Sequence, residues 1–423
     1  MKTAIPYTGD ISVLKAKALQ WAASFEAACY FDSNQYPDAY GSFDVLIAAG
    51  ARAEVCSPHG KAFDKLSAFL SEHTALIPGF LAYDLKNELE DLGSANPDPL
   101  EFPDLYFFVP EHLILIRGNR IEIESTDEAV LTTIERVTLD SDRKPFTGAI
   151  CSKFSRDSYI ETVNAIKHHI ARGDIYELNF CQEFYAEKAA INPLYVYKEL
   201  NSVSPVPFSC FFKHKNHFLL CASPERFLCR RGDKLISQPI KGTAARSNDK
   251  EEDNRLKQQL RNDEKEQSEN VMIVDLVRND LTRCAVPGSV KVEEIFGIYT
   301  FRQVHQMIST VVCLANPDFT NTGILKAAFP MGSMTGAPKV RAMELIEQYE
   351  KSKRGLFSGA VGYFGPEGDF DFNVVIRSLF YNKEKQYLSF QVGSAITFAS
   401  DAQKEYEECM LKAKAIFKVL TGS

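Results

Sequence analysis

The chain has 423 residues, of which 45% are hydrophobic and 25% charged, and it contains 23 glycines and 19 prolines. These proportions are ordinary for a packed globular protein, so they exclude disordered, collagen-like and fibrous classes. At about 100–200 residues per domain, the length predicts about two or three lobes with a sizeable core.

The 48 basic and 56 acidic residues give a net charge of −8. No basic stripe suited to phosphates is visible, so no nucleic-acid partner is expected. The chain shows neither the apolar core of a signal peptide nor a run of roughly 18 apolar residues, so no membrane association is expected. The ten cysteines form no C-x-x-C pair, which favours reduced thiols and a cytoplasmic location over zinc ribbons or disulfide scaffolds.

The first third of the chain mixes short apolar runs with turn residues. Runs rich in Val, Ile, Leu, Phe and Tyr predict strands at Phe43–Gly50, Leu76–Asp84 and Leu105–Ile123. The last of these is predicted to be a hairpin that turns at R-G-N-R, residues 117–120. The polar stretch Asp140–Thr147 is the best candidate boundary, so we predict two regions, 1–146 and 147–423.

The second region interleaves blocks of strands with long helices. Ser155 is a fitting N-cap for an amphipathic helix that continues to about Ala171. Strand-like segments lie at 174–186, 207–222, 226–230 and 234–240, and a very polar stretch follows at Ser247–Gln267. Further helices are predicted at about Asp263–Arg283, 338–349 and Ala402–Leu420. This order predicts an α/β (α+β) fold of mixed layers rather than strict βαβ alternation.

Two pairs of carboxylates stand at i,i+3 on two of these helices. Glu266 and Glu269 form the first pair, and Glu405 and Glu408 the second. Each spacing places both carboxylates on one helical face. If the faces met, their oxygens would suit a hard cation such as Mg²⁺. From the spacing alone, two solvated acidic faces are the simpler explanation.

A lysine lies beside a glycine at the end of a strand-like run. Lys241 belongs to the string Gln238-Pro-Ile-Lys-Gly-Thr243. A lysine whose stem is fixed at such a junction can aim its amine into a buried site and act as a nucleophile or base. The alternative is a surface lysine in a turn.

The string Gly332-Ser-Met-Thr-Gly-Ala-Pro-Lys339 superficially resembles a phosphate loop. Its spacing is wrong for one, and Pro338 removes a backbone donor, so a nucleotide-triphosphate site is rejected. The bend could still offer N–H groups and hydroxyls to an organic anion, or simply precede a helix. Among the histidines, His305 alone lies in an apolar, strand-like context, where a hydrogen-bonded core histidine is the default interpretation.

Several strings resemble the chorismate-utilising enzymes, the family of anthranilate, isochorismate, salicylate and aminodeoxychorismate synthases. The resemblance covers about residues 147–420 and is looser in the first region, where it rests on Gly79–Asp84. The matching strings are Ser223-Pro-Glu-Arg-Phe227, PIKGTAAR (239–246), ENVMIVDLVRNDLTR (269–283), FPMGSMTGAPKVRAME (329–344), Ile376-Arg377 and EYEECMLKAKA (405–415). The resemblance implies a large sandwich of two facing β-sheets flanked by helices, with the chorismate-binding catalytic region at 147–423.

The resemblance also implies a set of site residues. Glu269 and Glu408 would bind Mg²⁺ directly and Glu266 and Glu405 through water, and the metal would hold the ring carboxylate of chorismate. Lys412 would pair with that carboxylate, and Tyr363 and Arg377 would hold the enolpyruvyl carboxylate. His305 would be a general acid near the leaving hydroxyl. The remaining wall would comprise Gly242, Thr243, Ser333, Gly393, Ser394 and Ala395.

Lys241 points to one branch of the family. Anthranilate synthases resemble this segment but carry PIAGT, whereas aminodeoxychorismate synthases carry PIKGT. In that branch the lysine is thought to attack ring carbon 2 and ammonia then to enter at carbon 4. Two departures affect fine positioning: Glu177 replaces a usual glutamine, and Gly393-Ser-Ala395 replaces a more usual Gly-Ala-Gly.

No glutamine amidotransferase module is evident, so the resemblance implies that ammonia comes from a separate amidotransferase subunit. The nearest alternatives are an anthranilate or isochorismate synthase on the same fold, and a non-catalytic chorismate-binding relative. Phe31–Asn34 sits where some relatives contact tryptophan, and the sequence leaves tryptophan binding open.

Overall fold

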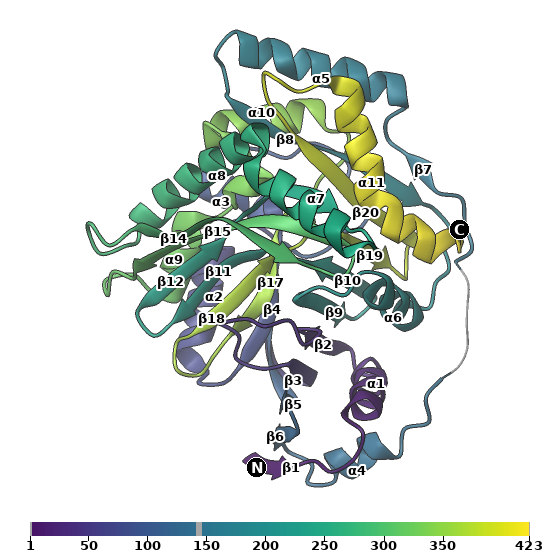
Figure 1. The fold of residues 1–423 in the computed structure, drawn as a ribbon. Coiled ribbons are helices and arrows are strands. Elements are labelled where there is room, and N and C mark those ends of the chain that lie inside the picture. The colour runs from purple at the N-terminus through teal and green to yellow at the C-terminus, as the bar shows by residue number, and fades with distance from the viewer. Residues whose placement is uncertain (1, 141–145, 423) are drawn as a thin grey trace.

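The computed structural model describes residues 2–140 and 146–422, which contain twenty strands and eleven α-helices (Figure 1). Within these ranges no helix is long and apolar enough to cross a membrane. Most of the predicted boundary, residues 141–145, lies outside the described residues. The division into 1–146 and 147–423 therefore stays a prediction.

Ten strands follow one another in a first, antiparallel sheet. β8 (Glu177–Ala186) forms its far end, where short strands β7 (Cys151–Ser152) and β16 (Gly336–Ala337) pair with its outer edge. The order is β1 (Lys2–Pro6), β6 (Arg120–Ser125), β5 (Leu105–Arg117), β3 (Val45–Ser57), β2 (Ala27–Asp32), β9 (Phe208–His214), β10 (His217–Ser223), β19 (Ser378–Asn382), β20 (Tyr387–Ile396) and β8.

A second sheet branches from the first half of β5. At its far side, β15 (Val304–Leu314) pairs with β12 (Lys234–Gln238) and then β13 (Ile240–Ala245) on one edge and with β14 (Lys291–Thr300) on the other. The order is β5, β4 (Ile77–Leu81), β17 (Ala360–Phe364), β18 (Phe370–Val374), β11 (Arg226–Arg231), β12 (Lys234–Gln238) and β15, with β13 (Ile240–Ala245) and β14 (Lys291–Thr300) beside β15.

The two sheets face each other across an aromatic core. Phe80 of β4 and Phe212 of β9 meet with ring centroids 5.3 Å apart. Alternation along a strand divides its side chains between two cores. In β2, Cys29 packs in the core between the sheets, whereas Tyr30 packs in a second core on the opposite face. The expected sandwich of two facing sheets is therefore confirmed.

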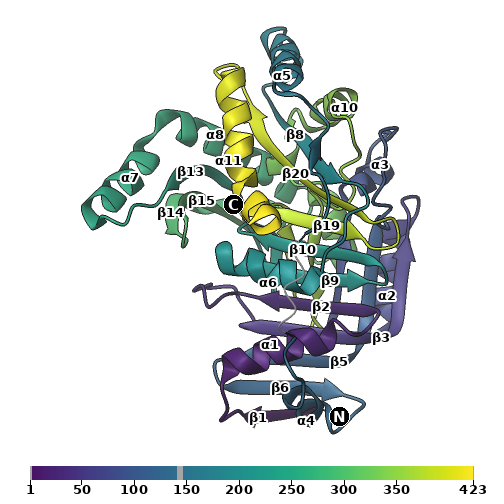
Figure 2. The same ribbon diagram turned by 90° about the vertical axis from the view of Figure 1, so that its right-hand side faces the viewer.

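Helices cover the outer faces. The second core, behind the first sheet, includes side chains from α1 (Ile11–Ala22), α4 (Val130–Glu135), α5 (Arg156–Ala171), α6 (Pro193–Val203), α10 (Lys339–Tyr349) and α11 (Ala402–Thr421). The second sheet packs with α2 (Ala62–Glu72), α8 (Glu264–Thr282) and α9 (Asn321–Ala328). In Figure 2, α5 and α11 stand at one end of the molecule, and β1, β6 and α4 lie at the other.

Most predicted elements are confirmed. The Ser155 side chain caps α5 by accepting from the backbone N–H of Ser158 at 3.1 Å, and Arg117 pairs with Arg120 across the predicted hairpin turn. Two predictions needed correction. The run 207–222 is a hairpin of β9 and β10, and the polar stretch 247–267 contains a helix, α7 (Lys250–Asn262).

Candidate active site

Lys241 lies where the edges of the two sheets come together. A register shift between Ile240 and Thr243 takes Lys241 and Gly242 out of the β13–β15 ladder. The Lys241 Nζ donates to Oε1 of Glu177, on β8, at 2.7 Å. The side chains are 10% and 1% exposed, respectively. Burial favours a lower pKa for Lys241, but the charges of Glu177, Glu269 and Glu225 outweigh it and raise the pKa above its usual value.

Gly242 permits a close approach between β13 and the helices. Its φ is +92°, a conformation that favours glycine. A Cβ at this position would lie 3.1 Å from Oε2 of Glu266 and 3.2 Å from Cδ1 of Leu260. Thr243, next along the strand, is exposed and pairs in register with Gln306. Gly242 therefore brings the lysine loop next to the acidic start of α8.

Glu225 is a buried carboxylate near Lys241. It follows β10, and its Oε1 accepts from the Ser333 hydroxyl at 2.6 Å. Burial raises its pKa to about 7, although the Ser333 hydrogen bond and the charges of Lys241 and Arg377 favour ionisation. Burial also lowers the pKa of Arg377, which the charge of Glu225 opposes. Glu225 lies in the string Ser223–Phe227 but was not predicted as a site residue; the available signal was an acid in the short link between two apolar strands.

The four predicted carboxylates lie on α8 and α11, and Lys265 of α8 contacts one of them on each helix. The Lys265 Nζ lies between the helices, 3.6 Å from Oε1 of Glu269 and 3.9 Å from Oε1 of Glu405. Burial raises the pKa of Glu269 to about 7, and its buried Oε1 has no hydrogen-bond partner among the described residues. Burial raises the pKa of Glu266 too, with a contribution from the charge of Glu408.

These carboxylates suit Mg²⁺ in donor type. A buried carboxylate oxygen without a hydrogen bond and like charges on two facing helices are features that a hard cation would stabilise. In the described ranges, however, no three His, Cys, Asp or Glu side chains are close enough together to hold a metal ion. The Lys265 ammonium supplies positive charge between the helices instead. Mg²⁺ binding stays a prediction.

The last helix presents its two glutamates differently. Glu405 is 3% exposed, whereas the Glu408 side chain is 45% exposed and pairs with Lys412 at 2.7 Å. Burial would raise the pKa of Glu408, but Lys412 holds it below its usual value. The Lys412 Nζ also donates to the Gly393 carbonyl at 2.9 Å. Lys412 therefore connects α11 to β20.

The β20 segment 393–395 lies beside β8. A Cβ at Gly393 would collide with Cys181, so the strands require glycine there. The Ser394 hydroxyl points toward the helices, 3.4 Å from the Tyr159 hydroxyl, and Ala395 pairs in register with Asn179. Any contact of Ser394 with a ligand near Lys241 would therefore come from its backbone.

His305 has hydrogen-bond partners on both ring nitrogens. Nδ1 lies 3.0 Å from the Thr300 hydroxyl and Nε2 lies 3.0 Å from Oδ1 of Asp253, and the residue is 1% exposed. This matches the default interpretation of a hydrogen-bonded core histidine. Its role as a general acid stays a prediction, and it would require one of these bonds to break.

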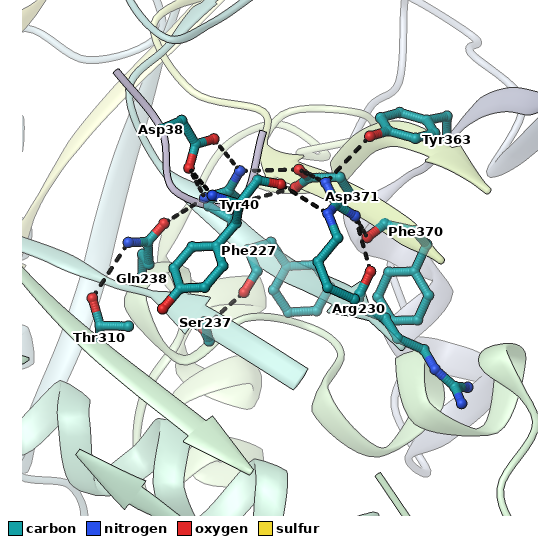
Figure 3. A network of polar contacts seen from close by, with 12 residues as sticks. Asp38, Tyr40, Phe227, Arg230, Ser237, Gln238, Thr310, Tyr363, Phe370 and Asp371 are labelled. Carbon is teal, nitrogen blue, oxygen red and sulfur yellow. Dashed lines mark hydrogen bonds and ion pairs between the residues drawn. The ribbon is translucent and has the colours of Figure 1, made fainter. Parts of the chain in front are cut away.

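Tyr363 lies in a different polar region. Its hydroxyl accepts from Arg231 at 3.3 Å, and its ring lines a cavity of about 550 Å³ together with Asp38 and Asp371. Figure 3 shows Tyr363 beside Asp371. The described contacts do not bring Tyr363 together with Arg377, so their shared role at one carboxylate stays a prediction.

The same region contains a closed network around Arg226. This side chain is 1% exposed and pairs with Asp38, with both oxygens of Asp371 at 2.9 and 3.0 Å, and with Oε1 of Gln238 at 2.6 Å. Figure 3 shows Asp38 and Gln238 on one side of the network and Asp371 on the other. We call these four residues the Arg226 network.

A family model described as chorismate binding enzyme matches residues 23–418. The chain belongs to this family. It is 34% identical to aminodeoxychorismate synthase component 1 of Bacillus subtilis (strain 168), covering 81% of this chain and 76% of that protein. It is also 34% identical to anthranilate synthase component 1 of Thermus thermophilus, and the match covers 89% of this chain and 85% of that protein.

Solved structures of chorismate-using enzymes share the fold. Anthranilate synthase component I from Streptococcus pneumoniae TIGR4 superposes with a TM-score of 0.76 at 27% identity, covering 90% of this chain and 94% of that one. MenF, the menaquinone-specific isochorismate synthase of Escherichia coli, has a TM-score of 0.78 at 18% identity, covering 99% and 94%, and shows the fold alone. Family and fold are thus shown, while relatives with different products are about equally similar.

Proposed function

We propose that the chain is the synthase subunit of an aminodeoxychorismate synthase, which converts chorismate and ammonia to 4-amino-4-deoxychorismate for p-aminobenzoate and folate. The observation that carries the proposal is the Lys241 amine, buried against Glu177 with Glu225 and Glu269 facing it. The similarity to proteins named aminodeoxychorismate synthase component 1 supports the same product.

In the first half-reaction, the neutral Lys241 amine forms a bond to ring carbon 2. The ring double bonds shift and the bond from carbon 4 to the hydroxyl breaks. Glu225 takes the role of general acid in place of His305, whose two ring nitrogens are both hydrogen-bonded. It supplies a proton to the departing hydroxyl, which leaves as water. A carboxyl with a pKa of about 7 is well suited to this task because much of it is protonated near neutral pH.

In the second half-reaction, ammonia forms a bond to carbon 4 and the bond from carbon 2 to Lys241 breaks. The electron pair returns to Nζ, and Glu225 recovers a proton from the new ammonium group. The product keeps its enolpyruvyl group because no bond to that group changes. A double displacement thus directs nitrogen to carbon 4, whereas direct attack at carbon 2 would lead toward anthranilate.

Cationic groups around the site suit the two carboxylates of chorismate. Arg377 can bind one carboxylate in a bidentate manner, and Lys412 can pair with the other. Glu269 and Glu408 would hold Mg²⁺, with Glu266 and Glu405 acting through water. When bound, the ion supplies positive charge for the ring carboxylate.

Ammonia would come from a separate glutamine amidotransferase subunit, as the name component 1 of the relatives suggests. A cytoplasmic location remains part of the proposal.

Product analysis tests this function. The purified chain is incubated with chorismate, Mg²⁺ and ammonium, and products are identified by mass spectrometry. We expect an amine that retains the enolpyruvyl group and is converted to p-aminobenzoate by the matching lyase, with no turnover when glutamine replaces ammonium. Anthranilate with pyruvate, or isochorismate, would assign the chain to another branch, and Mg²⁺-dependent binding without turnover would indicate a non-catalytic relative.

A further inference from the structure

Glu177 is a buried carboxylate with one unused oxygen. Oε1 accepts from the Lys241 ammonium at 2.7 Å, and the Glu177 side chain is 1% exposed. Oε2 is buried as well, and it has no hydrogen-bond partner among the described residues. Leaving one oxygen of a buried carboxylate without a partner costs stability, and such groups are enriched where a reaction uses them.

The backbone holds Glu177 firmly in this position. Glu177 pairs in register with Ala337 of β16 on one edge of β8, and the next residue pairs with Ile396 of β20 on the other. A Cβ at Gly336 would collide with the Glu177 carbonyl, so β16 packs tightly against this point. These contacts fix the backbone of Glu177, so its carboxylate has a defined position beside Lys241.

Other carboxylates face Lys241 from several elements. Glu269 and Glu225 raise the pKa of Lys241 together with Glu177, and Glu266 and Glu408 on α8 and α11 also interact with it. Glu177 is the one of these whose hydrogen bond to the amine is described. The resting amine is consequently protonated, whereas the proposed function requires it to be neutral.

We propose that Glu177 is the base that takes the proton from Lys241 and later returns it. This inference rests on the proposed function. Transfer along the 2.7 Å hydrogen bond converts the ammonium and carboxylate into a neutral amine and a neutral acid. The amine then bonds to carbon 2, and when it leaves carbon 2 it recovers the proton from Glu177. Glu225 handles the proton of the departing hydroxyl separately, so each group ends the cycle as it began.

The pair predicts a distinctive pH dependence. Moving a proton within the pair exchanges none with solvent, so the fraction of neutral amine does not depend on pH. In Glu177→Gln the amide can still accept a hydrogen bond but cannot take the proton. Lys241 must then lose its proton to solvent, and the fraction of neutral amine grows about tenfold for each pH unit below its pKa.

The experiment compares kcat for wild type and Glu177→Gln between pH 6.5 and 9 with ammonia held saturating. We expect the variant to be about 100-fold slower at pH 7, with the ratio of wild-type to variant kcat falling about tenfold per pH unit. Taking the ratio cancels the contribution of Glu225, which both enzymes share. Glu177→Asp, which keeps a carboxylate, should hold a constant ratio.

Glu183→Gln is the matched control. Glu183 lies on the same strand, is 2% exposed and bonds to Ser389 at 2.6 Å, away from Lys241. Its ratio should not vary with pH. A constant ratio for Glu177→Gln as well would overturn the proposal and leave Glu177 a structural partner.

A second measurement needs no turnover. Acetylation of Lys241 by acetic anhydride at a series of pH values, read by peptide mass spectrometry, reports its pKa in each folded variant. Removing the carboxylate should move the midpoint to lower pH, and an unchanged midpoint would contradict the pairing. If the wild-type chain forms neither product nor a Lys241 adduct, the proposed function fails instead, while this labelling still tests the pair.

Discussion

Two adjacent residues, Glu225 and Arg226, point into polar regions of opposite character. The Arg226 network is closed: every partner oxygen lies within hydrogen-bond distance of the guanidinium, and Asp371 also pairs with Arg231. The Lys241 region is open: Oε2 of Glu177 and Oε1 of Glu269 are buried without a hydrogen-bond partner among the described residues.

The contrast separates structural polar groups from functional ones. A fully paired network around a buried guanidinium fixes one arrangement of the chain segments that meet there. At Arg226 these are β11, β18 and the segment around Asp38. Half-satisfied buried carboxylates cost stability, and such groups concentrate where a ligand or a reaction uses them. Substitutions in the Arg226 network should therefore affect folding, whereas substitutions around Lys241 should affect activity.

The largest effect is expected for Lys241→Ala. Losing the nucleophile should lower kcat for aminodeoxychorismate formation by about 10⁴-fold, equivalent to about 5.5 kcal/mol. Steady-state kinetics with ammonium would measure it, with circular dichroism as a check on folding. Lys234→Ala, which removes a surface partner of Glu293, is the control and should keep full activity. Unchanged turnover in Lys241→Ala would remove the nucleophile from the mechanism.

Arg226→Ala should disrupt the Arg226 network and destabilise the fold. Removing the guanidinium leaves the part-buried Asp38 without its cation and Asp371 with Arg231 alone, so the free energy of unfolding should fall by about 3 kcal/mol. Urea denaturation measures it. Arg255→Ala, on an exposed ion pair with Glu252, should change it by less than about 1 kcal/mol. Comparable losses in both variants would mean that the network is not a stabilising unit.

Glu225→Gln should lower the activity and raise the stability of the protein at pH 8. It should lower kcat by about 100-fold and abolish the loss of activity that we expect in the wild type as pH rises through about 7, where Glu225 gives up its proton. In the folded wild type the pKa of Glu225 is about 7, whereas its ordinary value is 4.5. Unfolding thus releases a proton between these values, and rising pH favours the unfolded chain.

The stability of Glu225→Gln should accordingly match that of the wild type at pH 4 and exceed it at pH 8. Urea denaturation of both proteins at the two pH values measures the difference. A variant that is less stable at pH 8 would show that Glu225 belongs with the closed, structural region.

The smallest effect concerns Lys265. Its ammonium lies between the carboxylates of α8 and α11 and competes with any cation there. Since such half-exposed pairs contribute less than about 1 kcal/mol, Lys265→Met should tighten Mg²⁺ binding by about two- to fivefold. Isothermal titration calorimetry would measure it. Weaker binding in the variant would place the cation elsewhere.

Local patterns predicted most of the fold. Ser155 predicted the start of α5, and the R-G-N-R turn predicted the β5–β6 hairpin, because helix capping and turn formation depend on a few neighbouring residues. Helix α7 was missed because it has no apolar stripe. Leu260 is the one residue of this helix that is buried. The hairpin within 207–222 was missed because both arms are buried and apolar, so only the turn at Lys215 and Asn216 separates them.

The site was predictable as residue types but not as a spatial arrangement. The i,i+3 spacing found the four glutamates, yet it could not tell that Glu405 is buried and Glu408 exposed. Glu225 was missed because its hydrogen-bond donor, Ser333, is 108 positions away in the sequence. Asp38 and Asp371 lie 188 and 145 positions from Arg226, so no local pattern could have assembled that network or placed Tyr363 beside it.

Trapping the covalent intermediate tests the central claim most directly. The chain is incubated with chorismate and Mg²⁺ without ammonia, quenched, digested and analysed by mass spectrometry. We predict that the peptide containing Lys241 gains the mass of chorismate less one water, and that the adduct disappears when ammonium is added before the quench. A chain that forms aminodeoxychorismate under turnover conditions but never carries the adduct on Lys241 would contradict the account.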